Sequence, residues 1–297
     1  MEAVRVSATA MPQVRSVNQR IPARRLREGA GFVVHRPLPA PGGPAHVDPF
    51  LLIDEMGPVE YAPGEAVGAP DHPHRGVETV TYLLEGEFEH RDSAGHRSRL
   101  RPGDVQWMTA GRGVVHAELP SAALLANGGR VHGFQIWVNL PARLKMTAPR
   151  YQEVPGRAIP RARSDDGLAT VHVIAGTALG VAARIDTHTP IVYQHWALRP
   201  GASVHQPVPA DHNALVYVFR GQARVGGQPV AAREMAVLGP GDAVTLAVPP
   251  GADGAAELLL LAGVPHNEPI VQRGPFVMNS EAEIAAAYAD FAAGRLG

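Results

Sequence analysis

The stretch DHPHRGVETVTYLLEG, residues 71–86, decides how the first half of the chain is interpreted. Its histidines, His72 and His74, are one residue apart, so on a β-strand their imidazoles point to the same side. The apolar, β-branched run that follows predicts a strand, and Glu78 shares the parity of the histidines if no bulge intervenes. Two imidazoles at this position predict a metal site, provided that matching ligands occur elsewhere in the chain.

Matching ligands follow about thirty residues after Gly86, in GRGVVHAELP, residues 111–120, where His116 and Glu118 are again one residue apart. Two strands that each present such a pair can bring three imidazoles and a carboxylate together inside a barrel. The chain has no Cys, and a nitrogen and oxygen site of this kind suits Fe(II), Mn, Ni, Co, Cu or Zn. Four protein ligands on an octahedral metal leave two positions open for dioxygen or a substrate.

The composition is that of a globular protein, with 297 residues, 45% hydrophobic and 19% charged. A formal net charge of -1 gives no general attraction to nucleic acid or to an anionic membrane. The first residues lack the apolar core of a signal peptide, and the apolar run at residues 258–264 is too short to span a bilayer. We therefore expect a cytoplasmic protein that does not associate with membranes.

Arginine is concentrated near the start of the chain. Seven arginines fall within the first 36 residues: Arg5, Arg15, Arg20, Arg24, Arg25, Arg27 and Arg36. They form either a docking patch for a partner or a solvated edge strand, and we favour the edge strand because charge runs are usually solvated.

Short strands separated by turns are predicted throughout residues 30–140, where no segment has the length and period of a helix. Strands are expected in GFVVHRPL (31–38), RLRPGDVQWMTAG (99–111) and HGFQIWVNLP (132–141), and ETVTYLLEGEFEHRD (78–92) predicts a hairpin around Glu85 and Gly86. Residues 141–165 have no clear period and are expected to be a connector. A second β region follows in residues 166–297, and the capping-box spacing of Ser280 and Glu283 predicts a helix at about residues 280–293.

A weak internal repeat relates the two β regions. YLLEG (82–86) followed by RPGD (101–104) is echoed by YVFRG (217–221) followed by GPGD (239–242). The repeat predicts an all-β protein with two barrels of similar plan, in residues 1–140 and 166–297.

Four motifs in order give the chain a family resemblance: HPHRGVETVTYLLEG (72–86), GDVQWMTAGRGVVHAE (103–118), WVNLPARLKMTAPRYQE (137–153) and NEPIVQRGPFVMNSEAEI (267–284). The chain resembles the pirin family, a branch of the cupin superfamily. The resemblance implies a bicupin, in which two jelly-roll barrels lie face to face and a C-terminal α-helix follows. It also implies that the N-terminal barrel carries the metal.

Carried over position by position, the family's iron ligands fall on His72, His74, His116 and Glu118. Parity alone does not decide between Glu118 and Glu78, and the resemblance favours Glu118. Glu78 is then expected to support the metal ligands without binding the metal itself, or to hold Arg75 or Arg112.

The second barrel is expected to lack a metal. Counting from Gly221 and Gly241, the positions that match His72, His74 and His116 are Pro207, Pro209 and Gly254. Two further residues are candidates for the pocket of the first barrel: Arg112, on the turn before His116, and His132, at the start of a strand. The remaining histidines, including His90, show no paired spacing and are expected on the surface or in the core.

The resemblance implies a metal-dependent dioxygenase that cleaves flavonols such as quercetin, with one divalent metal per chain and Fe(II) favoured. Its partners would be a small aromatic substrate and O2, and Glu118 would be the base that accepts the proton of the substrate's 3-hydroxyl. The alternative is a redox-sensing or regulatory metalloprotein that acts through a protein partner, either a transcription regulator or a metabolic enzyme. We expect a monomer, because the two barrels already pair within one chain.

Overall fold

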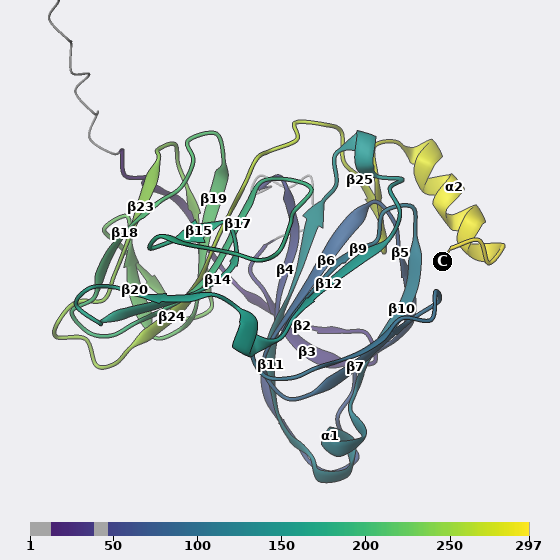
Figure 1. Ribbon diagram of the computed structural model, residues 1–297, viewed down its shortest axis with the longest axis horizontal. Helices are drawn as coiled ribbons and strands as arrows, with labels where there is room; N and C mark the ends of the chain where they lie inside the picture. Colours follow the sequence, from purple (N-terminus) through teal and green to yellow (C-terminus); the bar gives the residue numbers. More distant parts are fainter. Residues whose placement is uncertain (1–12, 39–46, 297) are drawn as a thin grey trace, which may run out of the picture.

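The computed structural model describes residues 13–38 and 47–296 and contains two β-barrels side by side (Figure 1). Each barrel consists of a seven-stranded sheet packed against a four-stranded sheet, which confirms the expected all-β class with two barrels. In the described part of the chain, no helix combines the length and the hydropathy needed to cross a membrane.

The N-terminal barrel is built from eleven strands in two sheets. Its large sheet has the order β12 (Arg150–Val154), β9 (Val105–Thr109), β6 (Val77–Glu85), β11 (Gly129–Asn139), β4 (Phe50–Tyr61), β3 (Phe32–Arg36), β2 (Arg24–Glu28). Its small sheet has the order β5 (Ala69–His74), β10 (Val114–Pro120), β7 (Phe88–Asp92), β8 (Arg97–Leu100).

The C-terminal barrel repeats this plan. Its large sheet has the order β1 (Val17–Pro22), β22 (Glu234–Leu238), β19 (Asn213–Arg220), β24 (Ala256–Gly263), β17 (Ile191–Leu198), β14 (Ala169–Ala175), β13 (Arg161–Arg163). Its small sheet has the order β18 (Ser203–Pro207), β23 (Ala243–Ala247), β20 (Gln222–Val225), β21 (Gln228–Ala231). YLLEG in β6 and YVFRG in β19 occupy the same place in the two large sheets, so the weak sequence repeat corresponds to a structural one.

Two short strand pairs and four helical segments complete the described structure: β15 (Thr177–Ala178) with β16 (Val181–Ala182), β25 (Val271–Arg273) with β26 (Phe276–Met278), α1 (Ala122–Asn127), α2 (Glu281–Ala292), and the 3-10 turns η1 (Ala142–Leu144) and η2 (Gly156–Ala158). The expected C-terminal helix is confirmed as α2. The hydroxyl of Ser280 accepts a hydrogen bond from the backbone N–H of Glu283, which is the predicted N-terminal cap.

The two large sheets pack face to face, and their strands are therefore buried on both surfaces. In β24, Leu258 and Leu260 point into the C-terminal barrel, whereas Leu259 and Leu261 join a core shared with the N-terminal barrel. That shared core includes Val80 and other residues of the N-terminal barrel, most of them from its large sheet. A continuous apolar run such as LLLL is therefore explained by burial on both sides of a strand.

Three expectations about the chain's path are wrong in detail. β6 and β7 do not form a hairpin, because after Gly86 the chain crosses from the large sheet to the small one. β1 belongs to the C-terminal barrel, where it pairs with β22, whereas the sequence predicts residues 1–140 for the first barrel. The expected connector, residues 141–165, contributes β12 to one large sheet and β13 to the other.

The arginine-rich segment is structural at two of its positions. Arg15 is buried and donates to the carbonyls of Pro209 and Gly239, and Arg36 forms a two-point hydrogen bond with Asp54. The arginines of β2 are exposed on an edge strand, as the favoured interpretation expects: Arg24, Arg25 and Arg27. Arg5 lies outside the described residues.

Candidate metal centre

Two neighbouring strands of the small sheet bring the three predicted imidazoles together. β5 and β10 are antiparallel, with His72 directly opposite His116 and with His74 opposite Val114. The three ring centroids are 4.4 to 5.0 Å apart, and one ligand atom from each histidine lies within 4.8 Å of the others. The predicted pairing of two i, i+2 motifs therefore produces a cluster of three potential metal ligands.

The state of these rings fits a transition metal. Nε2 of His74 and Nε2 of His116 are buried and have no hydrogen-bond partner among the described residues, while Nδ1 of His72 is bound to the carbonyl of Pro70 at 2.8 Å. Burial lowers the pKa of His74 to about 3 and the pKa of His116 well below its usual value. His74 and His116 are therefore neutral, and a neutral imidazole with a free lone pair is the form that binds metals.

Glu118 lies beside this cluster without joining the group of three. A β-bulge between His116 and Glu118 shifts the register of β10, and the Glu118 carboxylate accepts a hydrogen bond from the Thr81 hydroxyl at 2.8 Å. Glu118, His72 and His74 line the same cleft, so the carboxylate is accessible from the side of the cluster that the cleft reaches. Glu118 as fourth ligand stays a prediction.

His90 supports the cluster, although the sequence pattern gave no sign of it. It lies opposite Glu118 in the β7–β10 pairing, and its Nε2 is 2.8 Å from Nδ1 of His116. If Nε2 of His116 binds a metal, Nδ1 carries the proton and donates it in a hydrogen bond to His90. A partner of this kind fixes both the tautomer and the ring orientation of a metal ligand.

Lys145, the only lysine of the chain, holds the turn that follows His74. Its buried ammonium group donates to the carbonyls of Gly76 and Val277 and to Oδ1 of Asn139, at 2.7 to 2.9 Å. It therefore ties the end of the histidine strand to β11 and to β26. Its contacts join segments that are far apart in the sequence, so no local pattern predicts them.

The structure does not place Glu78 beside the histidines, and its recorded side-chain hydrogen bond is with Thr109 rather than with Arg75 or Arg112. The chain breaks strand parity at Gly76, where φ is +77° and β5 ends, so Glu78 does not continue the face of His72 and His74. Glu78 shares a face of β6 with Val80, which lies in the core between the barrels, whereas Thr81 points to Glu118. Burial raises the pKa of Glu78 to about 7.

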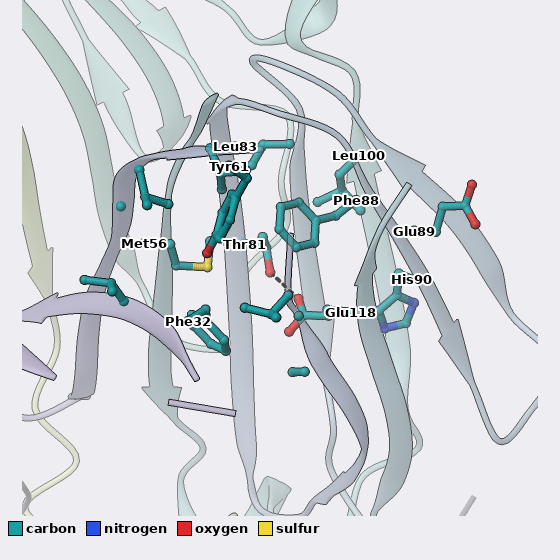
Figure 2. A pocket seen from close by; sticks show the side chains of 17 residues that line it. Phe32, Met56, Tyr61, Thr81, Leu83, Phe88, Glu89, His90, Leu100 and Glu118 are labelled. Carbon is teal, nitrogen blue, oxygen red and sulfur yellow. Dashed lines mark hydrogen bonds between the residues drawn. The ribbon is translucent and has the colours of Figure 1, made fainter. Parts of the chain in front are cut away.

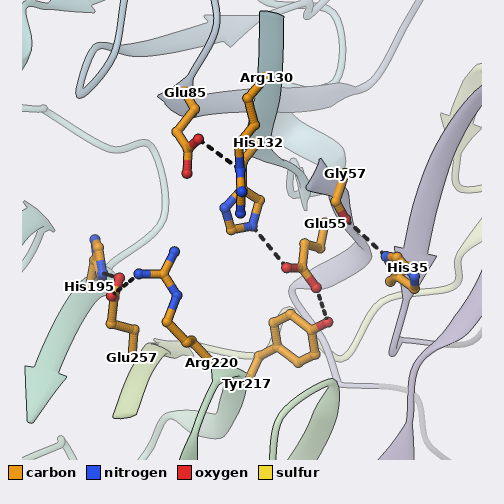
Figure 3. Close-up of polar contacts among 10 residues, drawn as sticks. All are labelled: His35, Glu55, Gly57, Glu85, Arg130, His132, His195, Tyr217, Arg220 and Glu257. Carbon is orange, nitrogen blue, oxygen red and sulfur yellow. Dashed lines mark hydrogen bonds and ion pairs between the residues drawn. The ribbon is translucent and has the colours of Figure 1, made fainter. Parts of the chain in front are cut away.

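His132 is also displaced from its predicted place, because it lies between the barrels. Its Nε2 is 2.8 Å from Glu55, whose other oxygen accepts a hydrogen bond from the Tyr217 hydroxyl at 2.6 Å (Figure 3). Tyr217 comes from β19, so this buried chain links the two large sheets.

Arg112 does not line the cleft that reaches the histidine cluster. Its side chain is exposed, and its backbone carbonyl accepts a hydrogen bond from Nε of Arg75 at 2.6 Å. Arg112 therefore contributes to the site through its backbone, by positioning the residue after His74.

An open cleft of about 500 Å³, here called the outer cleft, reaches the cluster. His72, His74 and Glu118 lie along it, and Phe32 and Trp137 supply apolar surface. The Trp137 ring packs edge to face against His74, with centroids 4.9 Å apart. The geometry therefore combines free imidazole ligands, a carboxylate and an apolar wall large enough for an aromatic molecule.

Comparisons with known proteins agree with this architecture. The family model "Pirin" matches residues 31–138, and "Pirin C-terminal cupin domain" matches residues 193–297. A pirin-like protein of Solanum lycopersicum and pirin of Homo sapiens are each 42% identical over 286 residues, covering 95% of this chain and 93% of theirs.

Solved structures show the same fold. A quercetin 2,3-dioxygenase from Acinetobacter baumannii superposes with a TM-score of 0.89 at 35% identity, covering 96% of this chain and 99% of its own. The bacterial pirin YhhW from Escherichia coli, in complex with nickel(II), has a TM-score of 0.58 at 21% identity, over 86% of this chain and 99% of its own. The chain, an all-β bicupin with a cluster of three histidines in its N-terminal barrel, belongs to the pirin family.

Proposed function

We propose that this protein is a metal-dependent dioxygenase that cleaves flavonols such as quercetin at a mononuclear centre. His72, His74, His116 and Glu118 would hold the metal, with Fe(II) favoured. The observation that carries the proposal is that unpartnered, neutral imidazole nitrogens converge at an open cleft of about 500 Å³. A planar polyphenol needs a pocket of roughly 300 Å³ or more, so the outer cleft is large enough.

Some residues of the outer cleft would bind the substrate, and Glu118 would accept its proton. Phe32, Met56 and Trp137 offer apolar surface to the aromatic rings of the substrate. A carboxylate oxygen of Glu118 accepts the proton of the substrate's 3-hydroxyl, and the Thr81 hydroxyl holds that carboxylate in place. When bound, the metal supplies Lewis acidity and the redox chemistry with dioxygen.

The polar side of the outer cleft limits how a substrate can lie. Arg36 is bound at two points to Asp54, with both hydrogen bonds at 2.6 Å, and it also pairs with Glu28 at 2.7 Å. Because both carboxylates already hold Arg36, this side of the cleft offers a substrate no unpaired guanidinium among its described lining residues. The cleft therefore favours a substrate with a neutral phenolic edge over one with a carboxylate. The similarity to a quercetin 2,3-dioxygenase at 35% identity supports the same substrate class.

The test is anaerobic loading of the protein with Fe(II), followed by quercetin and O2, with flavonol absorbance and carbon monoxide release as readouts. We expect metal-dependent loss of quercetin with carbon monoxide release, which His74→Ala and Glu118→Ala abolish together with metal binding. His205→Ala, on the exposed face of β18 in the other barrel, is the matched control and should behave as the unchanged protein.

Two outcomes would change the proposal. Full metal occupancy in Glu118→Ala would remove Glu118 from the ligand set. A well-loaded protein that leaves quercetin untouched would reject the dioxygenase, and would favour the alternative of a regulatory metalloprotein acting through a protein partner.

A further inference from the structure

A second space lies inside the N-terminal barrel, beside the Glu118 carboxylate, and the proposed function does not use it (Figure 2). This inner cavity has a volume of about 40 Å³ and lies between the two sheets of the barrel. Leu83 of β6, Phe88 of β7 and Leu100 of β8 are among its walls. Met56 and Glu118 line both the inner cavity and the outer cleft, so the two spaces adjoin each other at the metal centre.

The inner cavity offers little to a water molecule. Most of its lining is aliphatic or aromatic. Its polar side chains include Thr81, Glu89, His90 and Glu118, and the Thr81 hydroxyl is already engaged with Glu118 and Gln135. Among the described lining residues, Nδ1 of His90 is the buried side-chain atom without a hydrogen-bond partner. An ordered buried water needs about 2–4 polar partners, and apolar cavities that lack them stay dry.

The size of the inner cavity selects small guests. One water requires about 10–15 Å³ of such space, so a cavity of about 40 Å³ accommodates a diatomic molecule or a single xenon atom. A flavonol needs roughly 300 Å³ and is excluded. An apolar gas gains dispersion contacts with the walls and gives up no hydrogen bonds on entering.

We infer that the inner cavity binds dioxygen and supplies it to the metal centre from the side of Glu118, while the outer cleft takes the aromatic substrate. The inference rests on the proposed function, because only an oxygen-consuming centre gives dioxygen a role there. Two separate spaces allow the gas to reach the centre while the larger substrate fills the outer cleft.

The first test uses xenon as the probe, because it binds dry apolar cavities independently of metal and turnover. Crystals of the full chain, with and without metal, are pressurised with xenon. We expect a xenon peak in van der Waals contact with Leu83 and Phe88. Ordered waters in the inner cavity, with no xenon peak, would overturn the inference.

The second test changes the size of the inner cavity. Leu83→Phe should fill it, remove the xenon peak and raise the KM for dioxygen severalfold while leaving the KM for quercetin unchanged. Overpacking costs about 1–3 kcal/mol, so if this variant does not fold, Leu83→Ala decides instead, with an expected rise in xenon occupancy. Leu246→Ala, a buried leucine of β23 in the other barrel, is the control and should leave the xenon peak unaltered.

These measurements separate the inference from the proposed function. Quercetin cleavage with no xenon peak, or with an unchanged KM for dioxygen in Leu83→Phe, rejects the gas site alone. A xenon peak in a protein that binds metal but does not consume dioxygen rejects both the dioxygenase and the delivery of gas to it.

Discussion

Replacing Glu78 with Gln should stabilise the protein, and the gain should grow with pH. Glu78 is fully buried, and one carboxylate oxygen accepts a hydrogen bond from the Thr109 hydroxyl at 2.6 Å. Its other oxygen has no partner among the described residues. Burial therefore penalises the charged form and raises the pKa of Glu78 from 4.5 to about 7. An amide keeps the hydrogen bond to Thr109 without carrying a charge.

The sign and size of the effect follow from the two pKa values. Between pH 4.5 and 7 the folded state binds more protons at Glu78 than the unfolded state, so stability falls as pH rises through this window. At about 1.4 kcal/mol per pH unit, the full cost above pH 7 is about 3 kcal/mol. At pH 5 Glu78 is still protonated in the folded state, so only a small part of this cost is present, about 1 kcal/mol. Glu78→Gln removes this cost at both values.

The assay is urea or thermal unfolding of metal-free protein between pH 5 and pH 8, because metal binding is itself dependent on pH. The gap between Glu78→Gln and the unchanged protein should widen with pH, by several degrees in Tm between pH 5 and pH 8. Glu60→Gln, at an exposed position of β4, should show no such widening. A gap that is the same at every pH would refute the reasoning, and loss of metal binding in Glu78→Gln would return Glu78 to the metal site.

Three further substitutions test the supports of the site and the interface. His90→Ala should weaken metal affinity about 10–100-fold in a chelator competition, because His116 loses its orienting partner, whereas His96→Ala should not; equal affinities would exclude this role. Tyr217→Phe should lower the free energy of unfolding in urea by about 1–3 kcal/mol, since a buried oxygen of Glu55 loses its donor, and an unchanged midpoint would contradict this. Lys145→Met leaves three buried oxygens without a donor and should cost about 3 kcal/mol or more in thermal unfolding; a smaller loss would mean that water replaces the ammonium.

The cluster of three histidines could be predicted from the sequence because the pattern that indicates it is local. Strand alternation places His72 and His74 on one side, and a second pair with the same spacing, His116 and Glu118, suggests a neighbouring strand. The α2 cap is local in the same sense, since a serine and a glutamate three residues apart are enough to predict it.

The supports of the cluster could not be predicted, because they depend on which strands become neighbours. His90 meets His116 only after β7 pairs with β10, and Lys145 reaches the turn after His74 from another part of the chain. Strand alternation mispredicts Glu78 because the chain changes sheets at Gly76, so the parity of His72 and His74 does not continue into β6.

The change of sheets at Gly76 also explains how the second barrel affects the site in the first. Beyond that turn, β6 presents Val80 and Tyr82 to the core between the barrels and Thr81 to Glu118 inside its own barrel. The Tyr82 hydroxyl reaches Nδ1 of His195 in the other barrel at 2.9 Å. The face of β6 that meets the second barrel therefore fixes the position of the face that holds the Glu118 carboxylate. Because packed interiors transmit strain rather than absorb it, we expect the second barrel to act as a rigid wall that keeps Glu118 aligned with the histidine cluster.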